Sequence, residues 1–257
     1  MVDVTQKMSP DEYVDFIDNM VKEKWLGNHP FLDRLDRGEI TREQINKVAY
    51  QMMFYYNNSL RGLGSVMARH MDFETRYALM ENLIDEETEE RCGYAAHYVI
   101  ALDFAEACGY DRAEIEAANT KEVLRPHPQL EDALMELGGI ALGENPSLAL
   151  AGAMVGGEGL LPDLYIRIVQ GLKKQFGFTD KELDIFIVHI EGDIDHANEG
   201  RRLVRAYAKT PEERLSLYSV CKAARDRVYE AWDGVFRAAD LDLPQAVYPR
   251  QMAKAAE

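Results

Sequence analysis

The chain has 257 residues, of which 47% are hydrophobic and 29% are charged, with a formal net charge of −16. This composition is typical of a globular protein, and the charge argues against nucleic acids or anionic membranes as partners, because both bind clustered Lys and Arg. The three cysteines form no CxxC pair, the first residues contain no apolar signal segment, and no apolar run approaches the ~18 residues that span a bilayer. We therefore expect a cytoplasmic protein.

Helix start signals recur along the N-terminal half of the chain. Ser9-Pro10-Asp11-Glu12 combines a cap residue, a proline at the first helical position and a capping-box Glu, and Thr41-Arg42-Glu43-Gln44 is a second capping box. A third helix starts after Asp72, and the pattern becomes polar around residues 86–93, where we expect that helix to loosen or end. The predicted helices cover about residues 9–25, 31–35, 41–70, 72–84 and 94–108.

The C-terminal half is predicted to be helical as well. A helix near residues 129–137 is followed by three glycines that we expect to interrupt it, Gly138, Gly139 and Gly143. One helix is then predicted from about Pro146 to Phe176, and Thr179 and Thr210 cap the last two. No segment alternates with the period of a strand, so the chain is predicted to be all-α, a single helical-bundle domain over residues 1–239 with a C-terminal tail at 240–257.

The most informative motif is on the helix that follows Thr179. His189, Asp193 and His196 have the spacing i, i+4, i+7, which places them within an arc of about 60° on one helix face. Glu191 and Asp195 fall on the other side, and four isoleucine and valine residues can pack around the motif: Ile187, Val188, Ile190 and Ile194. Three metal-type ligands on one face indicate a metal site, whereas the simpler alternative is a polar helix with two core histidines.

Two other segments could complete such a site. Glu158 lies in an apolar, small-residue run where a carboxylate needs a strong partner, unless it is exposed at a glycine kink. The acidic run at residues 85–90 precedes His97, and only one or two of its carboxylates could be ligands because most charge runs are solvated. With Glu86 chosen, the set holds three carboxylates and three imidazoles, which suits a pair of iron or manganese ions better than zinc or calcium.

Three stretches resemble a known family, the haem-oxygenase-like diiron oxidases and oxygenases, relatives of the coenzyme-PQQ-synthesis protein C and of thiaminase II. They are residues 28–31 (Asn-His-Pro-Phe), residues 82–88 (Asn-Leu-Ile-Asp-Glu-Glu-Thr) followed by His97, and Glu158 followed by the His-x3-Asp-x2-His motif. The resemblance implies that six residues bind metal: Glu86, His97, Glu158, His189, Asp193 and His196. Glu86 is preferred over Glu87 and Glu90 because it is the first Glu of the matching segment.

The resemblance also implies an activity. The family suggests two Fe(II) ions, or one iron and one manganese, with O2 as co-substrate, an external electron donor and a homodimer. The implied reaction is oxidative C–C cleavage, desaturation or N-oxygenation of a small amino acid or related carboxylate in a biosynthetic pathway. One branch converts its own tyrosine to 4-aminobenzoate with a lysine ten residues after the bundle Glu; Ile168 stands there in this chain, so that activity is not expected.

Substrate contacts are weakly indicated, because each candidate could equally belong to the core or to the surface. Aromatic and sulfur-containing side chains could line a pocket, and two arginines in largely apolar helices could bind a carboxylate. The candidates are Met53, Tyr55, Tyr56, Arg61, Met154, Arg167 and Phe186.

Four alternatives to a diiron enzyme remain at this point, and the least specific is a non-catalytic interaction protein, because a fold alone does not establish a function. A metal-free protein of cofactor metabolism, similar to PQQ-synthesis protein C or thiaminase II, would not need the His-x3-Asp-x2-His motif. A thiaminase-II-like hydrolase would need a nucleophilic cysteine in its pocket, from Cys92, Cys108 or Cys221. A haem protein would need an axial histidine near the N-terminus, for which His29 is available.

Overall fold

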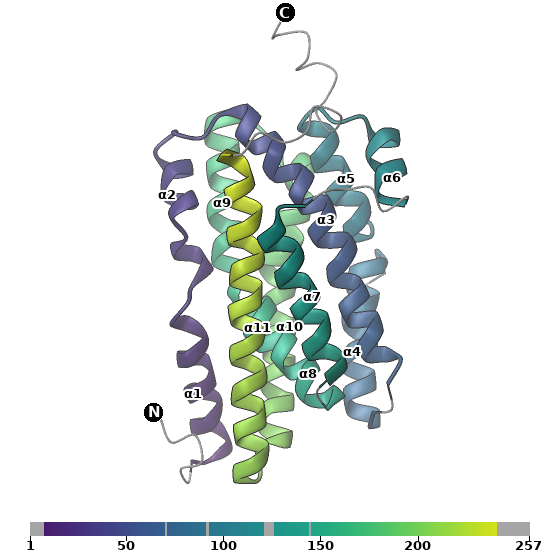
Figure 1. Ribbon diagram of the computed structural model, residues 1–257, viewed down its shortest axis with the longest axis vertical. Coiled ribbons are helices and arrows are strands. Elements are labelled where there is room, and N and C mark those ends of the chain that lie inside the picture. Colours follow the sequence, from purple (N-terminus) through teal and green to yellow (C-terminus); the bar gives the residue numbers. More distant parts are fainter. Residues whose placement is uncertain (1–7, 70, 91–92, 121–125, 144, 241–257) are drawn as a thin grey trace, which may run out of the picture.

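Long helices run side by side along the long axis of the molecule (Figure 1). The structure is a computed structural model that describes residues 8–69, 71–90, 93–120, 126–143 and 145–240, with the backbone alone at 59, 61, 119–120 and 141–143. Within these ranges every regular element is a helix, so the all-α prediction is confirmed. No helix among them is long and apolar enough to cross a membrane.

The N-terminal elements follow their sequence signals closely. They are α1 (Pro10–Lys22), η1 (Leu26–Asn28), α2 (Pro30–Asp36) and α3 (Arg42–Met67). Both predicted capping boxes form, Ser9 with Glu12 and Thr41 with Gln44. Each box satisfies two backbone N–H groups that the first turn of a helix leaves without partners.

The acidic run ends a helix, as predicted. Helix α4 (Phe73–Glu87) continues through Glu86 and ends at Glu87, with Thr88 as its C-cap residue. Helix α5 begins at His97 rather than near Tyr94 and ends at Ala107, and α6 follows at Arg112–Thr120. The last two turns of α4 are stabilised by tertiary contacts, because they carry the buried side chains of Asn82 and Glu86.

Helix α7 (Pro128–Gly143) is longer than predicted. Gly138 and Gly139 lie inside it, so the expectation that these glycines interrupt the helix is wrong. A glycine costs a helix only about 1 kcal/mol relative to alanine, and α7 packs extensively against α11 (Pro211–Arg237) and against α3. This packing outweighs the low helix propensity.

The single helix predicted from Pro146 to Phe176 is in fact broken. It consists of α8 (Pro146–Gly152), a π-helical turn η2 (Ala153–Gly157), a 3-10 turn η3 (Glu158–Leu160) and α9 (Pro162–Phe176). Pro162 has no N–H to continue the preceding helix. At Gly156 a Cβ atom would meet the carbonyl oxygen of Cys221, so the glycine allows α11 to cross here at close range.

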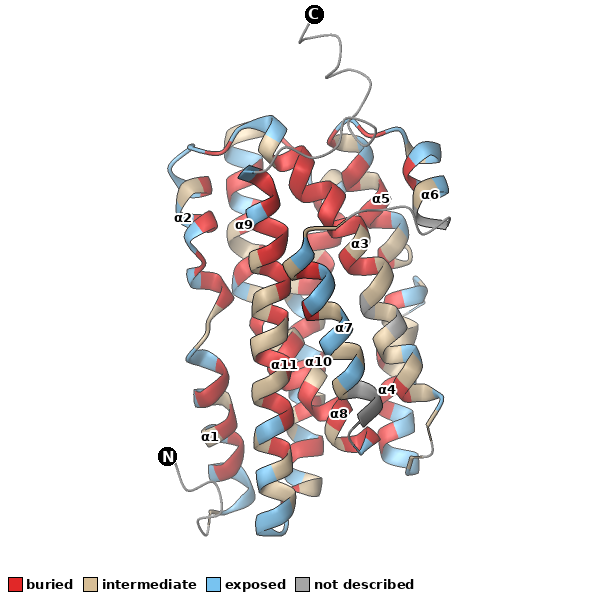
Figure 2. Ribbon diagram, viewed as in Figure 1, coloured by how far each residue is buried: buried red, intermediate tan, exposed pale blue. Residues whose placement is uncertain are grey.

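The remaining helices complete the core. The 3-10 turn η4 (Lys181–Leu183) leads into α10 (Asp184–Tyr207), and η5 (Ala238–Asp240) follows α11. Buried residues line the inner faces of these helices (Figure 2). Ile194, expected to pack around the motif, is 47% exposed. The predicted tail after residue 240 lies outside the described residues, and the domain boundary stays a prediction.

Candidate metal centre

The six residues singled out in the sequence lie together inside the bundle, in two groups. Glu86, His97 and His189 form one group and Glu158, Asp193 and His196 the other, and within each group one potential ligand atom per residue lies within 4.8 Å of the others. The groups combine α4, α5, η3 and α10, which are far apart in the sequence. Helix α10 contributes to both groups, because its i, i+4, i+7 face points inward.

The first group is held by two short contacts. His97 Nδ1 lies 2.7 Å from Glu86 Oε2, and the rings of His97 and His189 are 4.4 Å apart. His189 Nδ1 lies 2.6 Å from the carbonyl oxygen of Ile185. Because a carbonyl only accepts, Nδ1 carries the proton and donates it, which leaves Nε2 of His189 as the atom with a free lone pair.

The second group is supported from α4. His196 Nδ1 lies 2.8 Å from Glu158 Oε2 and 4.0 Å from Asp193 Oδ1. Asn82 Nδ2 donates to both oxygens of Glu158, at 3.3 and 3.4 Å, and Asp85 Oδ2 lies 3.3 Å from His196 Nε2. Asn82 and Asp85 therefore orient two candidate ligands from behind, a role that outer carboxylates and amides commonly have in metal sites.

The burial of these groups fits a metal centre. Asp193 is 1% exposed, and its Oδ2 has no hydrogen-bond partner among the described residues; the same is true of Nε2 of His97, which is 3% exposed. Buried polar atoms are nearly always satisfied, and buried carboxylates are paired or bound to metal. Two sets of carboxylate and imidazole donors match the preferences of iron and manganese.

The pKa shifts of these buried groups also fit a metal centre. Burial, strengthened by the proximity of Glu158, raises the pKa of Asp193 well above its usual value. Burial and the neighbouring His97 lower the pKa of His189 to about 3, so its imidazole is neutral, as a ligand must be. Burial opposes ionisation of Glu86, but His97 lowers the pKa of that carboxyl to about 2. A cation between these groups would relieve the repulsion that Asp193 experiences.

The structure also separates the acids of the 85–90 run. Glu86 is buried beside His97, whereas Glu87 and Glu90 are exposed. Only Glu86 of these three belongs to a potential metal-binding group.

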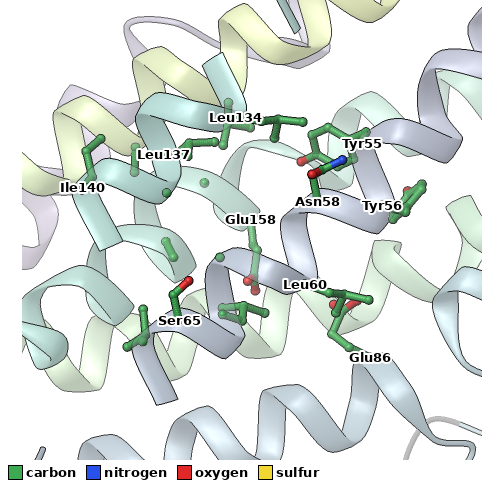
Figure 3. Close-up of a pocket in the computed structure, with 18 of the residues that line it drawn as sticks. Tyr55, Tyr56, Asn58, Leu60, Ser65, Glu86, Leu134, Leu137, Ile140 and Glu158 are labelled. Carbon is green, nitrogen blue, oxygen red and sulfur yellow. The ribbon is translucent and has the colours of Figure 1, made fainter. Parts of the chain in front are cut away.

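A cavity of about 520 Å³ reaches the candidate metal ligands from between α3 and α7. Figure 3 shows the carboxylate of Glu158 pointing into it and Leu134, Leu137 and Ile140 of α7 along its wall. The cavity also contacts Glu86, His189 and Asp193. The lining is mostly apolar, with polar groups from Asn57, Asn58, Ser65 and Glu131.

The predicted substrate contacts are only partly in this cavity. Tyr55 and Tyr56 line it, whereas Met53, Met154 and Phe186 are buried elsewhere in the core. Arg167 lies away from it and pairs with Asp33 and Asp36 of α2. The side chain of Arg61 lies outside the described residues.

Sequence reasoning missed several residues around the centre. Tyr165 of α9 lines the cavity, its ring is 5.3 Å from that of His189, and its hydroxyl is 3.2 Å from that of Tyr56. The polar side chains of α3 and the leucines of α7 look like ordinary helix faces in the sequence. Asn82 and Asp85 carried a usable signal, because Asn82 lies one helical turn before Glu86 and Asp85 lies directly before it.

The structure disfavours the thiaminase-like and haem alternatives, because the described residues that each would need are buried away from the cavity or already hydrogen-bonded. Cys108 and Cys221 are buried away from the cavity, and burial raises the pKa of each thiol to about 12, which disfavours a nucleophilic thiolate. Both ring nitrogens of His29 are engaged, with the Phe31 N–H and with Asp233. Cys92 lies outside the described residues.

Comparison with known proteins identifies the family. The model of a family described as iron-containing redox enzymes matches residues 47–229, a span that includes all six candidate ligands. The chain belongs to this family. It is therefore an iron-containing redox enzyme by family, and the metal-free alternative is disfavoured.

Several relatives are similar over most of their length. The chain is 27% identical to a 4-aminobenzoate synthase of Nitrosomonas europaea, over 89% of this chain and 92% of the relative. It is 26% identical to a 4-aminobenzoate synthase of Chlamydia trachomatis (79% and 84% covered) and 25% identical to a pyrroloquinoline-quinone synthase of Cereibacter sphaeroides (90% and 89% covered).

Solved structures confirm the fold. A domain of unknown function with a haem-oxygenase-like fold from Shewanella denitrificans superposes with a TM-score of 0.70 at 18% identity, covering 92% of this chain and 95% of that one. A protein of unknown function from Nostoc punctiforme gives 0.69 at 17% identity, covering 90% and 98%. The haem-oxygenase-like bundle expected from the resemblance is thus confirmed.

Proposed function

We propose that the protein is a non-haem diiron oxidase or oxygenase that uses O2 to oxidise a small organic molecule in a biosynthetic pathway. The observation that carries the proposal is the pairing of two buried ligand groups, each with carboxylate and imidazole donors, at the inner end of one cavity. Glu86, His97 and His189 would hold one iron and Glu158, Asp193 and His196 the other, with Fe(II) or an iron–manganese pair as the metals. When bound, such a centre would supply O2 activation, with O2 reduced by electrons from the Fe(II) ions, the substrate and the external donor.

The protein's own residues prepare the site for this chemistry. Asn82 and Asp85 hold Glu158 and His196 in position, and Ile185 fixes the tautomer of His189. Burial raises the pKa values of Tyr56 and Tyr165 well above the usual range, so both phenols stay protonated beside His189. One hydroxyl donates to the other, which leaves one O–H proton of the pair for an oxygen atom in the cavity. The apolar wall from α7 limits water near the reacting atoms.

The cavity changes the proposal for how the substrate is held, because the predicted arginine contact is lost. Arg167 is too far from the cavity to bind a substrate carboxylate directly, and the described lining contains no Lys or Arg side chain. Asn57, Asn58 and Ser65 can hydrogen-bond a neutral polar group, while the leucines of α7 contact an apolar part. An amino acid or related carboxylate remains in the proposal, with its apolar portion held between α3 and α7.

The names of the relatives suggest a second candidate, 4-aminobenzoate synthesis. Ile168 argues against it, because the family branch that forms 4-aminobenzoate from its own tyrosine uses a lysine at the position where this chain has Ile168. Analysis of the iron-loaded protein after exposure to O2 and a reductant distinguishes the two candidates: 4-aminobenzoate released without any added substrate would establish the second. An external electron donor, a homodimer and a cytoplasmic location stay predictions.

Anaerobic titration with Fe(II) tests the main proposal. We expect about two irons per chain, followed by O2 consumption that is accelerated by the correct substrate in a screen of amino acids, other carboxylates and amines. Glu158→Ala and His196→Ala should each lose iron while retaining helicity by circular dichroism. Unchanged iron stoichiometry and O2 consumption in both variants would contradict the proposal.

A further inference from the structure

A second cavity, of about 530 Å³, reaches the same ligands from another direction. It is formed by α10 together with residues of α4 and the start of α5, and it contacts His97, His189, Asp193 and His196. The two cavities share only His189 and Asp193 in their linings. The centre is therefore accessible by two routes with different walls.

The chemistry of this second wall is acidic. Asp85, Glu191 and Asp195 line it, and the described lining contains no Lys or Arg. Glu191 and Asp195 lie one turn apart on α10, on the side of the helix away from the ligand face but within the lining of this cavity; both are exposed, and neither has an ion-pair partner among the described residues. Neighbouring carboxylates without cations repel each other and create a negative potential at the cavity mouth.

Buried atoms at the inner end of this cavity lack partners. His97 lines the second cavity and not the first, and its Nε2 has no hydrogen-bond partner among the described residues. Asp193, which also lines the second cavity, has an unpartnered Oδ2. Both side chains are more than nine-tenths buried. The route thus leads from exposed carboxylates to buried donors that are ready to bind a cation.

The first cavity is poorly suited to that passage. Leu134, Leu137 and Ile140 form much of its wall, and apart from the candidate ligands Glu131 is the one carboxylate in its described lining, so a hydrated divalent ion finds fewer replacements for its water ligands there. In the second cavity, carboxylate oxygens can replace those waters step by step from the surface to the centre.

We propose that the acidic cavity formed by Asp85, Glu191 and Asp195 is the entry route for a divalent cation, Fe(II) in the first instance, separate from the substrate cavity. The inference rests on the proposed function, since it needs a metal at the centre. Glu191 and Asp195 attract the hydrated ion at the mouth, and Asp85, 3.3 Å from His196, is the next carboxylate on the way to the ligands.

Metal-loading kinetics test the route. The apoprotein is mixed anaerobically with Co(II), which shares ligand preferences with Fe(II), and uptake is followed by visible absorption in a stopped-flow instrument. The test variant is Glu191→Gln/Asp195→Asn. The matched control is Asp15→Asn/Glu116→Gln, which removes two exposed acids from α1 and α6.

We expect the test variant to load about 5- to 10-fold more slowly than wild type at low ionic strength, with unchanged final stoichiometry, because steering by charge affects the association rate. The difference should shrink as salt is raised, and the control should load like wild type. Gly192→Lys provides a second measurement: nothing lies within 4 Å of a Cβ at this lining position, so a side chain can be added there, and a lysine brings a positive charge to the cavity lining. It should slow loading more than Gly192→Ala.

The outcomes separate the two proposals. Equal loading rates for wild type and the test variant, or equal slowing in the control, would overturn the entry route while leaving the metal centre in place. No metal uptake by the wild-type protein would overturn the proposed function and the route with it.

Discussion

At the scale of single residues, burial and partner choice distinguish a ligand from a solvated acid. Glu86 and Glu90 are four residues apart in one acidic run, yet Glu86 lies 2.7 Å from a buried imidazole and Glu90 is exposed. Exposed carboxylates are hydrated at little cost, whereas a buried carboxylate needs a compensating charge. The two residues should therefore respond differently to the same substitution.

Glu86→Ala is expected to lower iron binding from about two to about one ion per chain, because the first ligand group loses its only carboxylate. Glu90→Ala, the matched control, should bind iron like wild type. Iron is measured by a colorimetric chelator after anaerobic loading and desalting. A loss of iron in the Glu90 variant alone would show that Glu86 is not the ligand.

At the scale of elements, the irregular segment between α8 and α9 positions Glu158. The π-helical turn at Ala153–Gly157 and the 3-10 turn after it replace a regular helix at the point where α10 and α11 pack closely against the chain. Turns of this kind inside helices are frequent at functional sites. Here the turn depends on Gly156, whose missing side chain makes room for the backbone of Cys221.

Gly156→Ala should destabilise the protein by about 1–3 kcal/mol, because the added methyl group forces α11 away. Gly139→Ala in α7 is the matched control: nothing lies within 4 Å of its Cβ position, and alanine has the higher helix propensity, so it should stabilise the protein by about 0.5–1 kcal/mol. Urea unfolding of both variants measures the changes. A Gly156 variant as stable as wild type would mean that the close crossing is not required.

At the scale of the whole molecule, a polar cluster connects the N-terminal segment to the last helix. Asp226 of α11 accepts from Lys222 at 2.7 Å and from Arg225 at 2.7 Å, and it lies 3.1 Å from Nζ of Lys24, just after α1. Arg225 also donates to the carbonyl oxygen of Met20 at the end of α1. Burial opposes ionisation, but these donors lower the pKa of Asp226 to about 2.

A carboxyl group whose pKa is lower in the folded state stabilises the fold above its unfolded pKa of about 4 and loses that contribution as pH falls toward 2. Asp226→Asn should therefore lower the free energy of unfolding by about 1–2 kcal/mol at pH 7. The difference from wild type should narrow between pH 4 and pH 2.5. Thermal unfolding across this range measures it, with Asp15→Asn on the exposed face of α1 as control; a difference independent of pH would contradict the assignment.

The sequence by itself determined the features that depend on neighbours along the chain. Capping boxes at Ser9 and Thr41 set two helix starts, because their hydrogen bonds span only three residues. The i, i+4, i+7 spacing placed His189, Asp193 and His196 on one face, because helix geometry is local. The predictions of a metal site and of a helical bundle also came from such local patterns, together with the family resemblance.

Only the tertiary structure decided what depends on contacts across the bundle. It placed Glu158 beside His196 and Glu86 beside His97, it kept α7 helical through Gly138 and Gly139, and it broke the predicted long helix before Pro162. It also removed Arg167 from the candidate pocket by pairing it with α2. These outcomes are set by packing and burial energies between distant segments, which local spacing and propensity do not contain.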